Sequence, residues 1–313
     1  MNSIESLKSE FNSQMRHFNK IDNKKILDDC IYVGSGDSYV AGLIVEFLTD
    51  HKCKCYSPSD LLNSKLLNDK TYCFISVTGK TKANIDLARR ATELGVKTIA
   101  VTQNSNSRLS QACREIVPLK ITAEHSPTAG FGTFIANVIT CLQIVGVRVP
   151  SKFDIWHKKG LELSHNLIDS MILPKKTLFL LGNNTLYALA LYASLKMSEF
   201  FCINAVAHKL EEFCHSPLFG IKKSHHLWIM GQNDERISKR LKKLGLHQSY
   251  LELHRADIFT QLFESIFFVQ TLMLLMAKKY GYTKLQYVLR QDILKASSDI
   301  IYYDVDPNRI LLT

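Results

Sequence analysis

The sequence predicts an α/β protein made of two units, each a parallel β-sheet with helices on both faces. Short apolar segments alternate with amphipathic helical segments along most of the 313 residues. Two of the apolar segments run into glycine-containing turns that open helices. The same order of strand, turn and helix begins again after residue 174. We therefore expect doubly wound, flavodoxin-like sheets, in which ligands bind at the carboxyl ends of the strands where the strand order reverses.

Residues 1–25 predict a leading helix, because their apolar side chains recur at helical spacing. These side chains are Ile4, Leu7, Phe11, Met15 and Phe18. Residues 26–150 form the first predicted unit, in which strand-like and helix-like segments alternate. The predicted strands are 30–33, 54–56, 71–76, 97–102 and 115–119, and the predicted helices are 38–48, 59–66, 84–94 and 133–146.

Residues 151–174 are predicted to be a connector with a helix, and residues 175–313 to be the second unit with a C-terminal tail. The predicted strands here are 176–181, 226–230 and 249–253, and the predicted helices are 186–200 and 258–280. The turn Gly182-Asn183-Asn184 takes the place that Gly34-Ser35-Gly36 has in the first unit. Two copies of one α/β unit explain this pattern.

The composition, 46% hydrophobic and 22% charged, is typical of a globular protein. No uninterrupted apolar run is long enough to span a membrane, and the most apolar stretch, 266–277, predicts a buried helix. The first residues lack the basic-then-apolar pattern of a signal peptide. We expect a cytoplasmic protein that does not bind a membrane.

The formal net charge of +10 raises the question of nucleic-acid binding. The basic residues are scattered, and the densest group has the spacing of a solvated helix face. That group is Arg236, Lys239, Arg240, Lys242 and Lys243. No alternation of aromatic and basic residues that would stack bases occurs. The excess of positive charge fits anionic metabolites as well, so charge alone does not decide the class of ligand. From the scatter of the basic residues we expect no nucleic-acid partner.

The eight cysteines do not predict disulfides or a metal site. Four of them lie within apolar segments, where a thiol behaves as a small hydrophobic group: Cys30, Cys73, Cys141 and Cys202. The one close pair, Cys53 and Cys55, falls on a strand-like run, and no CxxC or zinc-type histidine pair accompanies it. We expect neither a metal nor a cofactor.

The segment Ser76-Val77-Thr78-Gly79-Lys80-Thr81 predicts a phosphate-binding turn. Hydroxyl side chains and a glycine stand between a strand and a helix, whose first N–H groups and dipole favour an anion. The ending Gly79-Lys80-Thr81 resembles a Walker A loop, but Phe74 occupies the position of its first glycine. The segment therefore suits a single phosphate rather than a triphosphate.

A second turn, Gly34-Ser35-Gly36-Asp37-Ser38, also follows a strand and opens a helix. A dinucleotide-binding turn would have a third glycine where Tyr39 stands, and an acidic residue where Ser57-Pro58 follows the second strand. NAD binding is therefore disfavoured. The turn serves either as a tight turn alone or, through Gly36 and Ser38, as a second wall of the phosphate site.

Lys196 and Glu199 lie on one face of the predicted helix 186–200, among apolar residues. The pair is either a surface ion pair or a carboxylate base held at the edge of an apolar region. His215, which precedes Ser216-Pro217, is either a turn residue or an acid. The spacing of Lys196, Glu199 and His215 indicates a function only when the three residues are considered together.

Together, the two turns resemble those of the sugar isomerase (SIS) domain. Residues 191–221 are similar, without a gap, to the second SIS unit of the isomerase part of glucosamine-6-phosphate synthase. The shared pattern is Leu195-Lys196-x-x-Glu199 followed by His215-Ser216-Pro217-Leu218, and Gln270 echoes a glutamine in the last long helix. The resemblance covers about residues 26–295 and extends to archaeal-type phosphoglucose/phosphomannose isomerases.

The resemblance implies a fold of two SIS units and a role for each matching residue. Residues Ser76, Thr78, Gly79 and Thr81, with Gly36 and Ser38 opposite, would hold the phosphate of a sugar. Glu199 would move a proton between C1 and C2 through an enediol, beside Lys196, which would steady charge on the substrate oxygens. His215, lent by the partner subunit of a homodimer, would open the sugar ring.

The sequence departs from the synthase pattern at several places. Neither a glutaminase half nor a cysteine near Met1 is present, and Val77 replaces a glutamine. Residues 123–133 have no clear counterpart of a Ser-Thr-Lys segment, and Lys295 only loosely matches a C-terminal lysine. We therefore expect a phosphosugar aldose–ketose isomerase without glutaminase activity. An aminosugar-phosphate deaminase and a non-catalytic phosphosugar sensor are the alternatives.

Overall fold

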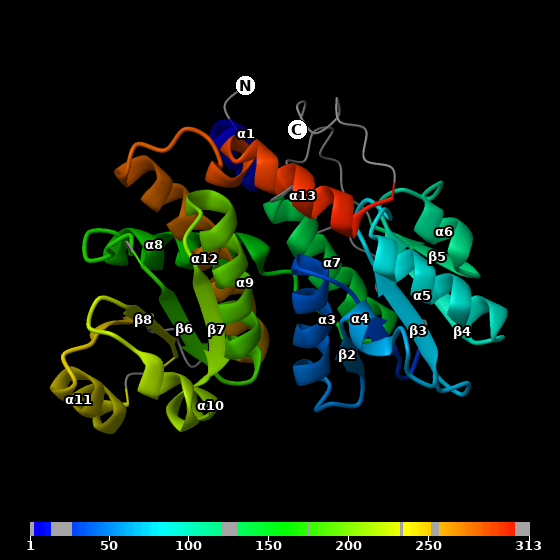
Figure 1. The fold of residues 1–313 in the computed structure, drawn as a ribbon, viewed down its shortest axis with the longest axis horizontal. Coiled ribbons are helices and arrows are strands. Elements are labelled where there is room, and N and C mark those ends of the chain that lie inside the picture. Colours follow the sequence, from blue (N-terminus) through cyan, green and yellow to red (C-terminus); the bar gives the residue numbers. More distant parts are fainter. Residues whose placement is uncertain are drawn as a thin grey trace. The chain divides into compact units, whose positions relative to one another are not determined.

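The computed structural model describes residues 3–13, 27–119, 130–174, 176–231, 234–251 and 257–303. The chain divides into two compact units. The first unit comprises Ser9–Val149 and Arg290–Thr313, and the second comprises Met1–Lys8 and Pro150–Leu289. Each unit holds one parallel sheet flanked by helices, which confirms the predicted fold class (Figure 1).

The first unit contains five parallel strands in the order β2-β1-β3-β4-β5. The strands are β1 (Ile31–Val33), β2 (Lys54–Tyr56), β3 (Thr71–Ile75), β4 (Lys97–Thr102) and β5 (Glu115–Pro118). The helices are α3 (Asp37–Leu48), α4 (Pro58–Leu61), α5 (Lys82–Glu93), α6 (Arg108–Ala112) and α7 (Phe131–Ile144). After β2 the chain passes to the other side of β1, so the strand order reverses between β1 and β3.

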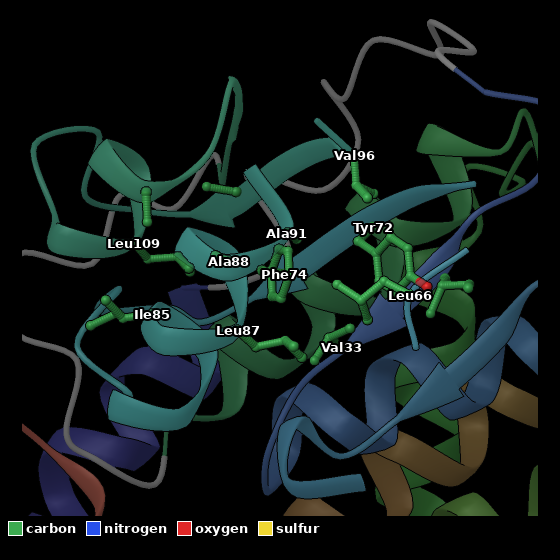
Figure 2. Packing of buried hydrophobic residues seen from close by; sticks show 13 residues of the cluster. Val33, Leu66, Tyr72, Phe74, Ile85, Leu87, Ala88, Ala91, Val96 and Leu109 are labelled. Carbon is green, nitrogen blue, oxygen red and sulfur yellow. The ribbon is translucent and has the colours of Figure 1, made fainter. Parts of the chain in front are cut away.

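Helices cover both faces of this sheet, with α3 and α7 on one side and α5 and α6 on the other (Figure 1). The Tyr32 hydroxyl of β1 donates a hydrogen bond of 2.6 Å to the Cys141 carbonyl of α7, which fixes that helix on the sheet. On the other face Val33 and Phe74 pack against Ile85 and Ala88 of α5 in a buried apolar cluster (Figure 2). Burial of this cluster holds α5, and hence its first turn, against the end of β3.

The second unit repeats this topology with four parallel strands in the order β7-β6-β8-β9. The strands are β6 (Leu178–Gly182), β7 (Ala205–Lys209), β8 (His226–Met230) and β9 (His247–Leu251). The helices are α8 (Phe153–Leu167), α9 (Thr185–Phe201), α10 (Leu210–His215), α11 (Glu235–Lys243) and α12 (Ile258–Lys279), with 3-10 turns η1 (Pro217–Gly220) and η2 (Gln286–Leu289).

Helix α12 packs closely against α8. The Trp156 indole lies flat on the Phe263 ring at 4.9 Å, and its N–H donates to the Thr260 hydroxyl. A Cβ at Gly160 would come within 2.7 Å of Phe267 Cβ and within 2.9 Å of the Glu264 carbonyl, so glycine permits this close contact. Within the described residues α12 has the length and composition of a membrane-spanning helix, but 67% of its apolar stretch is buried inside the protein. It therefore packs as a core helix.

Most predicted elements are confirmed, three strands of them (54–56, 97–102 and 226–230) to the residue. The predicted helix 59–66 is wrong beyond Leu61. The Arg90 guanidinium donates to the carbonyls of Leu61, Leu62 and Ser64, and this fixes them in a non-helical path. The predicted strand 249–253 is shifted, since β9 ends at Leu251 and residues 252–256 lie outside the described part.

The first and last helices of the described residues are α1 (Ser3–Ser13) and α13 (Gln291–Ile301). Met15 and Phe18 of the predicted leading helix lie outside the described residues. The residues from Arg290 onward are grouped with the first sheet, whereas the predicted boundaries place them with the second. The reason is local, because Tyr302 forms an antiparallel bridge with Thr81 at the start of α5.

Candidate functional site

The two predicted phosphate-binding turns lie at the carboxyl ends of neighbouring strands. The turn 34–36 follows β1 and the turn 76–81 follows β3, and β1 pairs directly with β3. This is the position where the strand order of the first sheet reverses and where doubly wound sheets bind ligands.

The turn after β3 is held by its own backbone. The Gly79 N–H donates to the Ser76 carbonyl, and the Gly79 carbonyl accepts from the Leu109 N–H of α6. Gly79 has φ +65°, and a Cβ there would lie 2.1 Å from the Ser107 hydroxyl. Only glycine therefore fits at this position.

The hydroxyl groups of Ser76 and Thr81 lie 3.3 Å apart, across the mouth of this turn. Thr81 is the residue before the first turn of α5, and its side chain makes no capping bond. Thr78 is exposed on the turn and Ser76 is buried at its base. The turn thus combines hydroxyl donors with the N-terminus of a twelve-residue helix, a combination that suits an anion.

The turn after β1 supplies the neighbouring wall. Gly36 has φ +57° and is the residue before α3, and Ser38 in the first turn of α3 is 8% exposed. A Cβ at Gly34 would lie 2.7 Å from the Ser38 backbone, so glycine lets the helix start close to the strand. The structure thus places Gly36 and Ser38 beside the turn 76–81 along the same sheet edge.

The second unit has the same turn after β6. Asn184 has φ 52° and ψ −129°, almost the values of Gly36, φ 57° and ψ −131°. A Cβ at Gly182 would meet the Leu186 carbonyl, as one at Gly34 would meet Ser38. The repeat inferred from the sequence is therefore present in the backbone of both turns.

Lys196 and Glu199 form an ion pair on α9, with Lys196 Nζ 2.7 Å from Glu199 Oε2. The Lys196 side chain is fully buried, whereas that of Glu199 is 30% exposed. Burial makes an unpaired ammonium costly, so Glu199 compensates the charge of the buried Lys196.

The ion pair is linked to a buried tyrosine and a buried glutamine. The ammonium group of Lys196 lies 5.3 Å from the centre of the Tyr192 ring, one turn back on α9. The Tyr192 hydroxyl accepts a hydrogen bond of 3.0 Å from the Gln270 amide of α12. Gln270, which the resemblance singled out, is thus connected to Glu199 through Tyr192 and Lys196.

His215 ends α10 with 72% of its side chain exposed, and its Nε2 lies 3.9 Å from the exposed carboxylate of Glu211. Helix α9 runs back from the carboxyl edge of the sheet, so Glu199 in its last turn lies toward the amino edge, whereas α10 starts at the carboxyl edge. The topology of one unit therefore does not bring His215 to Glu199.

Two contributors to the first-unit site were missed by the sequence analysis. Asn84 is buried in the first turn of α5, where its amide donates to the Ile75 carbonyl at the end of β3. Tyr303 donates its hydroxyl to Asp86 of α5, and Lys82 and Arg108 lie over its ring. The Asp86 hydrogen bond raises the pKa of Tyr303. An asparagine in the first turn of a helix is only a weak sequence signal for a site residue. No sequence pattern pointed to Tyr303.

The remaining predicted features are placed as follows. Lys295 lies on α13 in an exposed pair with Asp299 at 2.7 Å. Residues 123–129 of the segment without a synthase counterpart lie outside the described part. No group of three His, Cys, Asp or Glu side chains that could hold a metal occurs in the described ranges. All eight cysteines are free thiols.

No family model matches this chain. It is 26% identical over 215 residues to the glutamine–fructose-6-phosphate aminotransferase [isomerizing] of Tropheryma whipplei. The match covers 61% of this chain and 33% of that enzyme, so the chain spans about a third of the length of the curated relatives it matches.

Three solved structures share the fold over most of the chain. Glucosamine-6-phosphate deaminase from Thermotoga maritima has a TM-score of 0.73 and 18% identity, covering 90% of this chain and 96% of that one. The tagatose-6-phosphate ketose/aldose isomerase of Escherichia coli has a TM-score of 0.65 and 16% identity, with coverages of 90% and 89%.

The C-terminal domain of glucosamine-fructose-6-phosphate aminotransferase from Francisella tularensis has a TM-score of 0.64 and 16% identity, with coverages of 88% and 95%. All three proteins are named for phosphorylated sugars. The chain therefore shares its fold with these three proteins over most of its length.

Proposed function

We propose that this protein is a sugar-phosphate isomerase that moves a proton between C1 and C2 of a phosphorylated hexose or aminosugar. The observation that carries the proposal is the buried Lys196 held against the partly exposed Glu199. A module that only binds a sugar does not need a carboxylate base supported by a buried ammonium group. The names of the similar proteins support the same class of substrate.

In this proposal the sugar phosphate binds to the turn 76–81. The hydroxyls of Ser76, Thr78 and Thr81 and the first N–H groups of α5 donate to its oxygens, and Gly79 gives the turn the shape that this requires. Ser38 and Gly36 form the facing wall on the neighbouring strand. Hydroxyls and N–H groups suit a phosphate monoester, whose charge the helix N-terminus favours.

Glu199 then acts as the base. Its carboxylate takes the proton from C2 of the aldose while the C1 carbonyl oxygen gains a proton, which gives the enediol. Returning the proton to C1 while the C2 hydroxyl loses its own proton completes the ketose, so no other reactant is consumed. Because Lys196 is buried and paired, we assign it the role of orienting Glu199.

His215 is proposed to open the sugar ring in the site of a partner subunit. Two observations support this role. The His215 side chain is exposed at the end of α10, where it can reach a second copy, and Glu199 of the same unit lies toward the opposite edge of the sheet. The protein is then a cytoplasmic homodimer in which each site uses Glu199 of one subunit and His215 of the other.

The runner-up is an aminosugar-phosphate deaminase, favoured by the similarity to the Thermotoga maritima deaminase. The proton transfer is shared by both reactions, and they differ in whether ammonia leaves C2. A phosphosugar sensor is the remaining alternative. The resemblance to archaeal-type phosphoglucose/phosphomannose isomerases stays a prediction about the substrate.

An assay of four substrates with the wild type and Glu199→Gln tests the proposal. We expect the wild type to turn over fructose-, glucose-, mannose- or glucosamine-6-phosphate. The assay measures the sugar product and the release of ammonia. Glu199→Gln keeps an oxygen that accepts from Lys196, so it should fold and bind the substrate, yet lose about 10²-fold or more in rate. Tight binding without turnover by the wild type would indicate the sensor, and full activity of the variant would exclude Glu199 as the base.

Mixing two inactive variants tests the shared site. Equal amounts of His215→Asn and Glu199→Gln, unfolded and refolded together, should recover about a quarter of the wild-type activity, because half of the dimers are hybrids with one intact site. Each variant refolded alone is the control. No recovery in a mixture that forms hybrid dimers would place Glu199 and His215 of one site on the same subunit.

A further inference from the structure

A pocket of about 420 Å³ opens at the amino ends of β6, β7 and β8 in the second unit. It is lined by Lys176, Thr177, Cys202, Ile203, Asn204 and His225. Its volume is in the range of sites for small metabolites. None of these six lining residues has a part in the proposed reaction.

The polar groups around the pocket are mostly donors. Lys176 offers an ammonium group and His225 an imidazole, and no carboxylate lines the pocket. The Asn204 amide donates to the Thr177 hydroxyl at 3.2 Å, which links the chain before β6 to the chain before β7. Ammonium, imidazole, amide and hydroxyl groups together match the oxygens of a phosphate or a carboxylate.

The surroundings add positive charge. Four stretches form the strands of this sheet and lead into them: 172–182, 201–209, 221–230 and 241–251. None of the four contains Asp or Glu, and the carboxylate in the last turn of α9, Glu199, is paired with Lys196. The pKa of His225 is lowered by burial and then by the charges of Lys222 and Lys176, so these cations act on one region. The negative end of α9 near Cys202 opposes an anion, but it amounts to about half a charge against the full charges of the two lysines.

We propose that this pocket binds the oxyanion of a small metabolite, a phosphate ester or a carboxylate. Lys176 supplies the charge, and His225, Asn204 and Thr177 supply hydrogen-bonding groups. Cys202 lies in the pocket and caps α9, the helix that carries Glu199, so an occupant contacts the last turn of that helix.

Alkylation of Cys202 provides a local probe of this site. The full-length protein is treated with iodoacetamide, and the modified Cys202 and Cys214 peptides are quantified over time by mass spectrometry. At an inorganic phosphate or citrate concentration of about twice Kd, modification of Cys202 should slow about threefold. Cys214, exposed on α10 outside the pocket, is the internal control and should not change beyond the effect of sodium chloride at equal ionic strength.

Two variants connect the protection to the pocket. Lys176→Ala should abolish most of it, whereas Lys158→Ala, which removes the same charge from an exposed position on α8, should retain it. Asn204→Ala provides a second variant within the pocket that keeps the net charge and should also weaken protection. Circular dichroism confirms that each variant is folded.

The outcomes separate this site from the proposed active site. In Ser76→Ala/Thr81→Val protection of Cys202 should persist, and its loss there would overturn the proposal. Protection by phosphate alone identifies a phosphate site, and protection by citrate alone a carboxylate site. Equal modification of Cys202 with and without both anions, or unchanged protection in Lys176→Ala, would also overturn it. None of these results depends on isomerase activity.

Discussion

At the scale of single residues, the candidate site depends on backbone conformations that few side chains permit. Gly79 has φ +65° and contacts Ser107 where a Cβ would stand. Gly36 has a positive φ but open space around it, and its counterpart Asn184 adopts the same conformation with a side chain. The steric requirement for glycine is therefore stronger in the turn after β3 than in the turn after β1.

Gly79→Ala tests this requirement. Added strain at positive φ costs about 1 kcal/mol, and the clash with Ser107 adds to it because the turn must move. We expect a loss of stability above about 2 kcal/mol in urea unfolding, together with weaker phosphosugar binding. The control is Gly95→Ala, which has φ +79° and nothing within 4 Å, and should show the strain alone. Equal losses in both variants would contradict a steric role for Ser107.

At the scale of elements, the sequence predicts those that are buried or strongly periodic. All five residues of β3 are buried, and so are all residues of β4 except Lys97. Strand β7 was missed because it lies at the sheet edge with partly exposed residues, and its apolar run is only three residues long. Helices α6 and α10, of five and six residues, are too short for periodicity to show.

The same distinction applies to the candidate site. The residues of the turn 76–81 and the pair Lys196 and Glu199 follow from local patterns, a strand-to-helix turn and a three-residue helical spacing. The support of Lys196 by Tyr192 and Gln270 depends on how α9 packs on α12. A sequence does not state such a tertiary contact, which is why Tyr192 was missed.

The packing of α8 on α12 gives a prediction at this scale. Gly160→Ala places a methyl group where Phe267 and the α12 backbone lie within 3 Å, so the helices must separate. We expect a destabilisation of about 1–3 kcal/mol, with faster hydrogen exchange in both helices. Lys158→Ala on the exposed face of α8 is the matched control. A stability equal to the wild type would show that these helices tolerate a wider spacing.

At the scale of the whole molecule, the two units differ in their histidines. Burial lowers the pKa of His157, His208 and His226 in the second unit, and the nearby His247 lowers that of His226 further. The described histidine of the first unit is His51, in an exposed contact of 2.8 Å with Glu46. Acid should therefore affect the second unit more.

The direction of the pH dependence follows from these lowered pKa values. In the unfolded chain these histidines bind protons near their ordinary pKa of 6.5, whereas the folded unit resists protonation. Their contribution to stability is full above pH 6.5 and is lost as the pH falls through the lowered values. Hydrogen exchange at about pH 7.5 and about pH 5.5, corrected for intrinsic rates, should show larger losses of protection in α8 and β8 than in α5.

His226→Gln is the matched variant, since it removes one of these titrations while keeping a polar side chain. Its second unit should lose less protection on acidification than that of the wild type. Equal acid sensitivity in the two units of the wild type would contradict the assignment.

The bridge between Thr81 and Tyr302 has a consequence for biosynthesis. The first unit is completed by residues from Arg290 onward, and the whole second sheet is encoded between its two parts. A ribosome synthesises from the N-terminus, so β1 to β5 emerge long before the segment that pairs with the start of α5. The first unit of the nascent chain therefore lacks its last segment while the second unit is translated. Chaperones that act on the growing chain would meet that incomplete surface, and the phosphate turn gains its contact with Tyr302 only after the second sheet has been synthesised.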